Sequence, residues 1–138
     1  MFEKILVAYD GSAAADKALD LAFDLAGKYG AQVKLLAVAQ PPDFGSEVET
    51  EAVLQNSHKH YQQVLKPVTK RLATSGLKFE VEVVSGHPAE HIVLAAEQWG
   101  AQLIVMGHRG KGLMGRWLIG SVAKQVMHHA LCAVLVAR

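Results

Sequence analysis

Short apolar segments alternate with helical patterns along the chain, and this alternation constrains the fold more than any other feature. Each apolar segment is short enough for a single strand, and the stretches between them are long enough for helices. The order is therefore β-α-β-α-β-α-β-α-β. It predicts a Rossmann-like α/β domain over residues 1–138, an open five-stranded parallel sheet with right-handed crossovers and helices on both faces. The strand segments are residues 4–9, 33–39, 79–84, 103–106 and 133–136.

The strand segments differ in the positions that they should take within the sheet. Residues 79–83 alternate apolar and acidic side chains, which is typical of an edge strand or of a strand with one wet face. Residues 103–106 are apolar on both faces and should lie inside the sheet. Residues 133–136 are equally apolar, yet the last strand should lie at an edge. Because an uncovered apolar edge invites pairing, we expect a homodimer formed through residues 133–137.

Local signals set the helix boundaries. The first helix should begin after the cap Ser12 and end at Gly30. Its core-facing stripe should be Ala14, Ala18, Leu21, Ala22, Leu25 and Ala26. The opposite, solvated face should carry Asp16, Asp20 and Asp24. The second helix, residues 47–74, contains Pro67, which should kink or split it near residue 63.

Composition and charge limit the class of protein. With 138 residues, of which 51% are hydrophobic, the chain suffices for one domain with a sizeable core. No apolar run approaches the ~20 residues of a membrane span, and the start does not resemble a signal peptide, so we expect a soluble, cytoplasmic protein without membrane insertion. Residues 98–138 hold five basic residues and no acid, although the whole chain carries a net charge of only +1. That is too little charge for a nucleic-acid groove but suits one small polyanion.

Glycines are concentrated in one loop. Five of the 12 glycines fall within residues 107–120, directly after the fourth apolar segment and before a helix that Gly120 and Ser121 can open. Bare backbone allows close approach, helix N-termini present free N–H groups, and the cations Arg109, Lys111 and Arg116 complete a cradle for an anion. The sequence therefore predicts a phosphate site here. The alternative is a surface loop with solubilising charges.

Two known glycine motifs do not explain this loop. A Walker loop requires Ser or Thr after Gly110-Lys111 and a glycine at position 105, and the chain has Gly112 and Val105 there. Residues 110–115 do spell G-x-G-x-x-G, but no acid follows Glu97 to hold a ribose as in dinucleotide-binding domains. Neither motif is therefore our interpretation.

Asp10-Gly11-Ser12 closes the first strand segment and should face the same crevice as the glycine loop. In open α/β sheets, ligands bind at the carboxyl ends of the strands where the strand order reverses. Asp10 would order a ribose hydroxyl or hold Mg²⁺ against phosphates. The alternative for Asp10 is a turn residue that supports the Ser12 cap.

The other reactive side chains give weaker signals. Residues 87–91 spell the H-x-x-E-H of inverted zinc peptidases, but Pro88 suits the first helical position, which makes His87 a cap rather than a ligand. Cys132, which has no second cysteine to pair with, is expected to be a small core residue rather than a nucleophile beside His129.

The glycine loop has no carboxylate, and His108 is its only neutral-pH base. Binding is therefore favoured over hydrolysis.

The sequence resembles the universal stress protein family along essentially its whole length. Gly107-x2-Gly110, nine further residues and Gly120-Ser121 fit the family motif G-x2-G-x9-G-[ST]. Residues 5–12 look like its opening strand and turn, and residues 84–89 resemble its turn before the third helix. His108 and Cys132 depart from the family pattern, which often has Ser or Thr and Pro at these positions.

The resemblance implies strand order 3-2-1-4-5, a dimer through the last strand, and the ATP-binding branch of the family. It places adenine beside Val38 and Met106, and phosphates on the N–H and hydroxyl groups of residues 120–122. ATP and Mg²⁺ are the implied ligands, Asp10 being the residue that holds the metal indirectly. The expected nucleotide-binding residues are Ala8, Asp10, Val38, Met106, Gly107, Arg109, Gly110, Gly120, Ser121 and Val122.

The leading functional hypothesis is a dimeric, ATP-binding regulatory protein of the stress response, whose nucleotide state is read by a partner protein. A slow ATPase or nucleotidyl-transfer enzyme of related fold is the first alternative. A nucleotide-independent interaction module is the second. ATP, ADP and cyclic AMP remain open as the physiological ligand, because they make most of the same contacts.

Overall fold

A computed structural model describes residues 1–40, 47–109 and 119–138. Most of the glycine loop, including Gly110, Gly112 and Gly115, thus lies outside the described residues. The elements follow the predicted alternation. In chain order they are β1 (Lys4–Ala8), α1 (Ala13–Tyr29), β2 (Gln32–Ala39), α2 (Glu47–Thr74), β3 (Phe79–Ser85), α3 (Pro88–Trp99), β4 (Leu103–Gly107), α4 (Ser121–His129) and β5 (Ala133–Ala137).

The strands form one parallel sheet in the order β3-β2-β1-β4-β5, as predicted. The edge position expected for residues 79–83 is confirmed, as is the interior position of residues 103–106. One row of paired residues crosses all five strands, so the register is continuous from edge to edge. That row is Phe79, Val33, Ile5, Leu103 and Ala133.

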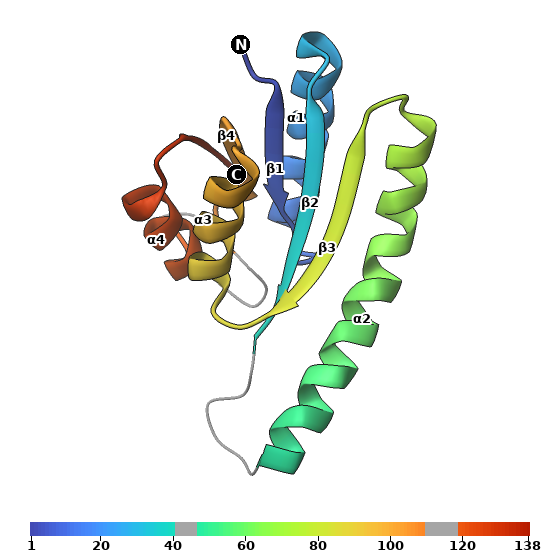
Figure 1. The fold of residues 1–138 in the computed structure, drawn as a ribbon, viewed down its shortest axis with the longest axis vertical. Coiled ribbons are helices and arrows are strands. Elements are labelled where there is room, and N and C mark those ends of the chain that lie inside the picture. Colours follow the sequence, from blue (N-terminus) through green and yellow to red (C-terminus); the bar gives the residue numbers. More distant parts are fainter. Residues whose placement is uncertain (41–46, 110–118) are drawn as a thin grey trace.

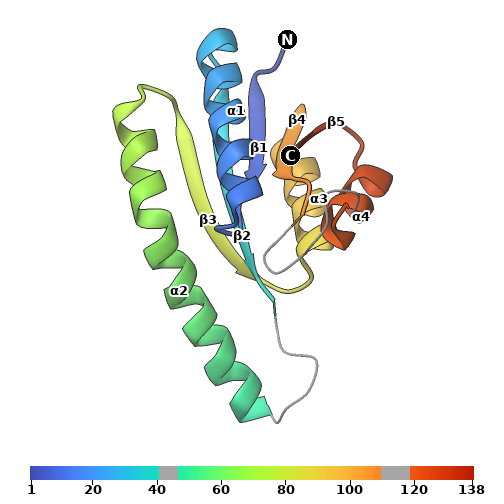
Figure 2. The same ribbon diagram turned by 180° about the vertical axis from the view of Figure 1, so that it is seen from behind.

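Helices cover both faces of the sheet and bury two separate hydrophobic clusters. Figure 1 shows α3 and α4 over one face, and Figure 2 shows α1 and α2 over the other. Odd-numbered residues of β1, such as Ile5 and Val7, belong to the cluster under α1 and α2, whereas Leu6 belongs to the cluster under α3 and α4. This alternation follows from the two-residue period of a strand, and it explains why the inner strand β4 is apolar on both faces.

Helix α1 has the predicted ends, but its buried stripe is rotated from the predicted one. The Ser12 hydroxyl accepts a hydrogen bond from the Ala15 N–H, and Gly30 ends the helix in the left-handed conformation. Leu21 was expected in the core but is 42% exposed, and Leu25 is only half-buried. Ala15 and Leu19 are buried instead, because α1 packs on the sheet through the side of the helix that carries them together with Ala18 and Ala22.

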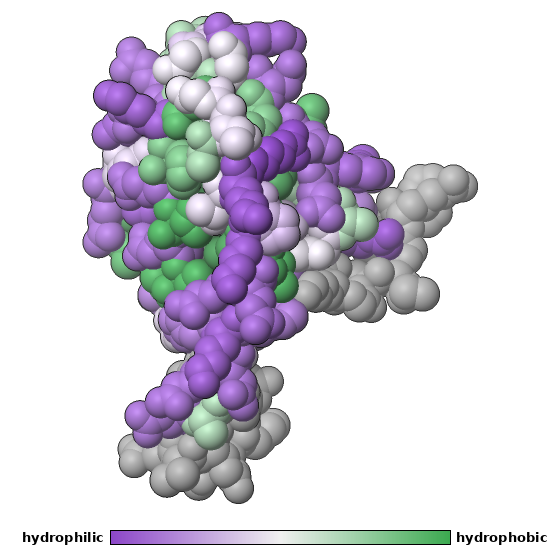
Figure 3. All heavy atoms as spheres, turned by 90° about the vertical axis from the view of Figure 1, so that its right-hand side faces the viewer, coloured by the Kyte–Doolittle hydropathy of each residue, from purple (hydrophilic) through white to green (hydrophobic). Residues whose placement is uncertain are grey.

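Helix α2 is continuous over Glu47–Thr74, so Pro67 does not split it, which was one of the two outcomes that the sequence predicted. Pro67 and Gln63 both lie on the exposed side of the helix, where water can hydrate the Gln63 carbonyl that loses its N–H partner. The buried residues Leu65, Val68 and Leu72 hold the helix against the sheet. The first turns of α2 extend beyond the sheet in Figure 1, and the outer surface of the helix is mostly hydrophilic in Figure 3.

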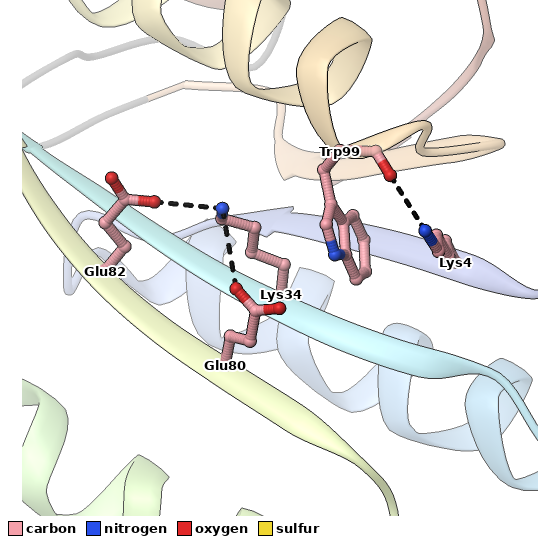
Figure 4. A network of polar contacts seen from close by, with 5 residues as sticks. All are labelled: Lys4, Lys34, Glu80, Glu82 and Trp99. Carbon is pink, nitrogen blue, oxygen red and sulfur yellow. Dashed lines mark hydrogen bonds and ion pairs between the residues drawn. The ribbon is translucent and has the colours of Figure 1, made fainter.

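The face of β2 and β3 beside α3 carries a small charged network, drawn in Figure 4. Lys34 Nζ lies 2.9 Å from a Glu82 carboxylate oxygen and 3.7 Å from one of Glu80, and the lysine side chain is only 13% exposed. Lys4 Nζ donates to the carbonyl of Trp99 at 3.1 Å. The acidic side chains of the edge strand β3 are thus paired with Lys34. This pairing stabilises their negative charges on the solvent-accessible face of β3.

Gly107, the last residue of β4, is in close contact with the backbone of α1. A Cβ atom at this position would lie 2.7 Å from Ala14 Cβ, 2.8 Å from the Ala14 carbonyl carbon and 2.9 Å from the Ala15 nitrogen. Two of these three atoms are backbone, which cannot rotate away. The first glycine of the sequence motif therefore has a packing reason of its own, in addition to any contact with a ligand.

Gly107→Ala is expected to lower the free energy of unfolding by about 1–3 kcal/mol, because α1 must move to admit the methyl group. Gly27→Ala is the matched control. No atom lies within 4 Å of a Cβ there, and the replacement should raise helix stability by about 0.5–1 kcal/mol. Urea unfolding of both variants measures the two changes, and equal effects would contradict the packing role of Gly107.

Candidate functional site

A cavity of about 400 Å³ lies at the carboxyl ends of β1, β2 and β4. Nine of the ten residues that the sequence singled out line it, namely Ala8, Asp10, Val38, Met106, Gly107, Arg109, Gly120, Ser121 and Val122. The tenth, Gly110, lies outside the described residues. Segments from both ends of the chain thus meet at the point where the strand order reverses.

The turn after β1 explains how Asp10 reaches the cavity. One carboxylate oxygen, Oδ1, accepts a hydrogen bond of 2.9 Å from the Ser12 N–H, and Gly11 takes a positive φ of 80° to close the turn. Asp10 is therefore a turn residue as well as a cavity residue, and the two interpretations are compatible. Its second oxygen, Oδ2, has no hydrogen-bond partner among the described residues, which makes it available as an acceptor.

The N-terminus of α4 supplies hydrogen-bond donors to the cavity. Gly120 is the N-cap residue and has no side chain to accept from the first N–H groups of the helix. Its own N–H donates to the His108 carbonyl at 2.7 Å, so the phosphate contact expected from that N–H is replaced by a bond within the protein. The N–H groups of Ser121 and Val122 remain as donors, and Arg109 adds a positive charge to the lining.

His108 has a structural position rather than the expected one in the ligand loop. The side chain is buried, and its Nδ1 donates to the Ala137 carbonyl at 3.1 Å. The backbone N–H of His108 donates to the same carbonyl at 2.6 Å. His108 thus joins the end of β4 to the end of β5, and it does not line the cavity.

Residues without any motif form much of the lining. On the face of α3 and α4 the wall is apolar, with Leu36, Ile92 and Pro88 beside Val38 and Met106. On the other face the wall includes Tyr9 and Tyr61. Sequence reasoning missed Leu36, Ile92, Pro88, Tyr9 and Tyr61, because core residues and lining residues have the same apolar and aromatic character.

His87, His91 and Cys132 do not line the cavity. His87 is the N-cap of α3, as predicted, and the ring of His91 covers Gly86. Burial raises the pKa of the Cys132 thiol, which lowers its reactivity. Within residues 1–40, 47–109 and 119–138, no three metal-ligating side chains gather at one point.

The sequence matches the universal stress protein family over residues 1–138, and the chain belongs to this family. It is 35% identical over 141 aligned residues to universal stress protein MJ0531 of Methanocaldococcus jannaschii, covering 100% of this chain and 83% of that protein. Among solved structures, the universal stress protein UspA from Lactobacillus plantarum superposes with a TM-score of 0.90 at 27% identity, covering 99% of this chain and 98% of that one.

A universal stress protein solved in complex with cAMP is a more distant structural relative. It has a TM-score of 0.76 at 22% identity, and the match covers 99% of this chain and 97% of that chain. At this identity the likeness shows the fold alone.

In the described part of the chain, the helices are too short or too polar to span a bilayer.

Beneath the cavity, the Tyr9 hydroxyl donates a hydrogen bond of 2.5 Å to Asp16. Asp16 was expected on the solvated face of α1 without a role. It is exposed, yet its carboxylate fixes the Tyr9 ring beside the Asp10 turn. Burial raises the pKa of the Tyr9 phenol above its ordinary value of 10.0, and the hydrogen bond with Asp16 and the charge of that carboxylate raise it further.

Tyr9→Phe is expected to lower the free energy of unfolding at pH 7 by about 1–2 kcal/mol, because a hydrogen bond to a charged group is lost. The phenol keeps its proton longer in the folded protein than in the unfolded chain, so its stabilising effect is complete below pH ~10 and declines above it. Urea unfolding at pH 7 and above pH 10 should show the wild-type advantage shrinking. An advantage that grows with pH would contradict this assignment.

Proposed function

We propose that the cavity binds Mg²⁺-ATP and that the protein is a dimeric, nucleotide-dependent regulator of the stress response. The observation that carries this proposal is the convergence of nine motif residues on one cavity with two chemically different parts. One part is apolar and suits an adenine base. The other offers helix N–H groups and Arg109 to phosphates. The fold is compatible with such a ligand, since a distant relative with the same fold was solved in complex with cAMP.

The residues of the cavity fit a metal-bound triphosphate. Asp10 has one carboxylate oxygen that is not used by the turn, and carboxylate oxygens are the ligands that Mg²⁺ prefers. A bound Mg²⁺ would supply charge neutralisation between Asp10 and the phosphates. Asp10 is also the only carboxylate in the described lining, and no histidine lines it, so the site is better equipped for binding than for fast hydrolysis.

Asp10→Asn is expected to weaken Mg²⁺-ATP binding about tenfold, since the amide oxygen still accepts from Ser12 N–H but no longer attracts a cation. Isothermal titration calorimetry measures the affinity, and thermal unfolding should show little change in stability. Asp24→Asn is the control, because Asp24 lies on the exposed face of α1 and pairs with Lys28. Unaltered affinity in Asp10→Asn would refute the proposed site.

The edge strand β5 is the proposed dimer interface. Among the described residues its only strand neighbour is β4, and Leu131 just before it is 86% exposed. A large apolar side chain beside a free strand edge is the kind of surface that a symmetric partner covers.

Leu131→Asp is expected to weaken the dimer by at least tenfold, because a charge would be buried in the interface. Sedimentation velocity over a concentration series gives the dissociation constant. Leu94→Asp is the control, since Leu94 is 45% exposed on α3, away from β5. A wild-type chain that sediments as a monomer at all concentrations would overturn the interface.

A further inference from the structure

Tyr61 reaches the cavity from α2, a helix that carries none of the sequence motifs. Its ring is half-buried and packs against the cluster under α1 and α2. The same side chain lines the cavity together with Asp10. Tyr61 thus adds a wall on the side of the cavity opposite to the apolar wall of Leu36 and Met106.

The Tyr61 hydroxyl is a hydrogen-bond donor in a cavity that the acceptor Asp10 also lines. Burial raises the pKa of Tyr61, and the negative charge of Asp10 raises it further, so the phenol keeps its proton at neutral pH. No hydrogen bond to this hydroxyl is formed by the residues that the structure describes. In the same cavity, Asp10 has one oxygen bound to the Ser12 N–H and the other without a partner in the described residues.

A second contact of α2 fixes the position of Tyr61. His58 lies three residues earlier, on the same side of the helix, and its Nε2 is 2.5 Å from Ser85 Oγ. Ser85 is the last residue of β3 and pairs in register with Ala39 of β2. The hydrogen bond therefore ties α2 to the carboxyl edge of the sheet one turn away from Tyr61.

We propose that Tyr61 and Asp10 together bind the ribose hydroxyls of the nucleotide, with Tyr61 donating and Asp10 accepting, and that the His58–Ser85 contact positions Tyr61. This inference rests on the proposed function of the cavity. Its new content is that α2 contributes to the site and makes it prefer nucleotides whose ribose carries a free hydroxyl.

The chemistry of the cavity favours a ribose at this point. The N–H groups of Ser121 and Val122 attract the phosphates, and the proposed Mg²⁺ would separate them from the Asp10 carboxylate. The second lone pair of Asp10 Oδ2 then remains to accept from a ribose hydroxyl. A purine base suits the apolar wall on the other face. A vicinal diol both donates and accepts hydrogen bonds, which matches one phenol and one carboxylate oxygen.

The test compares Tyr61→Phe with the wild type for Mg²⁺-ATP and for Mg²⁺-2′,3′-dideoxy-ATP, which lacks both hydroxyls. Tyr61→Phe should weaken ATP binding roughly three- to tenfold, the effect of one lost hydrogen bond, and should change dideoxy-ATP binding by less than about twofold. Tyr29→Phe is the matched control, because Tyr29 is 46% exposed at the end of α1 and does not line the cavity. Thermal unfolding checks that both variants fold.

The positioning role has its own variant. Ser85→Ala removes the partner of His58 but keeps the Tyr61 hydroxyl, and it should lower the preference for ATP over dideoxy-ATP by about twofold or more. Ser75→Ala is its control, since Ser75 Oγ donates to the Leu72 carbonyl at the far end of α2. An unchanged preference in Ser85→Ala would overturn the positioning role.

The outcomes separate this inference from the proposed function. Wild-type protein that binds ATP while Tyr61→Phe binds both nucleotides as the wild type does would overturn the role of Tyr61 alone. Equal losses for both nucleotides would also overturn it, since the phenol would then contact the base or only support the fold. Wild-type protein that binds neither nucleotide would overturn the proposed function and this inference with it.

Discussion

The pairing of β1 with strands on both of its edges is the constraint on which the rest of the structure depends. Ile5, Leu6 and Val7 have no exposed surface, because β2 and β4 cover the edges and helices cover both faces. The chain leaves β1 towards β2 and then β3, and returns later to β4 on the other side. The carboxyl ends of β1 and β4 therefore diverge into different helices, and the cavity forms between them.

Close packing of α1 on β4 then determines how the two motif segments meet. Gly107 lets the first turn of α1 approach so closely that a methyl group has no room. The same turn begins at Ser12, which is held by Asp10. His108 continues the connection by bonding to Ala137 of β5 and, through its carbonyl, to Gly120 at the start of α4. The geometry of the cavity thus depends on contacts that involve no ligand.

The two faces of the sheet give the cavity two kinds of wall, and this division decides what it can bind. Leu36, Val38 and Met106 point to the side of α3 and α4, where they form an apolar surface. Tyr9 and Tyr61 lie on the side of α1 and α2, close to the carboxylate of Asp10. The adenine nucleotide proposed for this cavity would place its base on the apolar surface, its ribose near Asp10 and its anionic phosphates where α4 begins.

The sequence by itself determined the order of strands and helices along the chain, the helix caps and the motif residues. Periodicity and capping act between residues close in sequence, so a local pattern reveals them. Ser12, Gly30, His87 and Gly120 have the predicted cap positions. Only the tertiary structure decided which side of α1 is buried, that α2 remains whole at Pro67, and that Tyr61 enters the cavity. These features depend on how elements distant in the chain pack together, and packing leaves no local pattern by which a lining tyrosine differs from a core tyrosine.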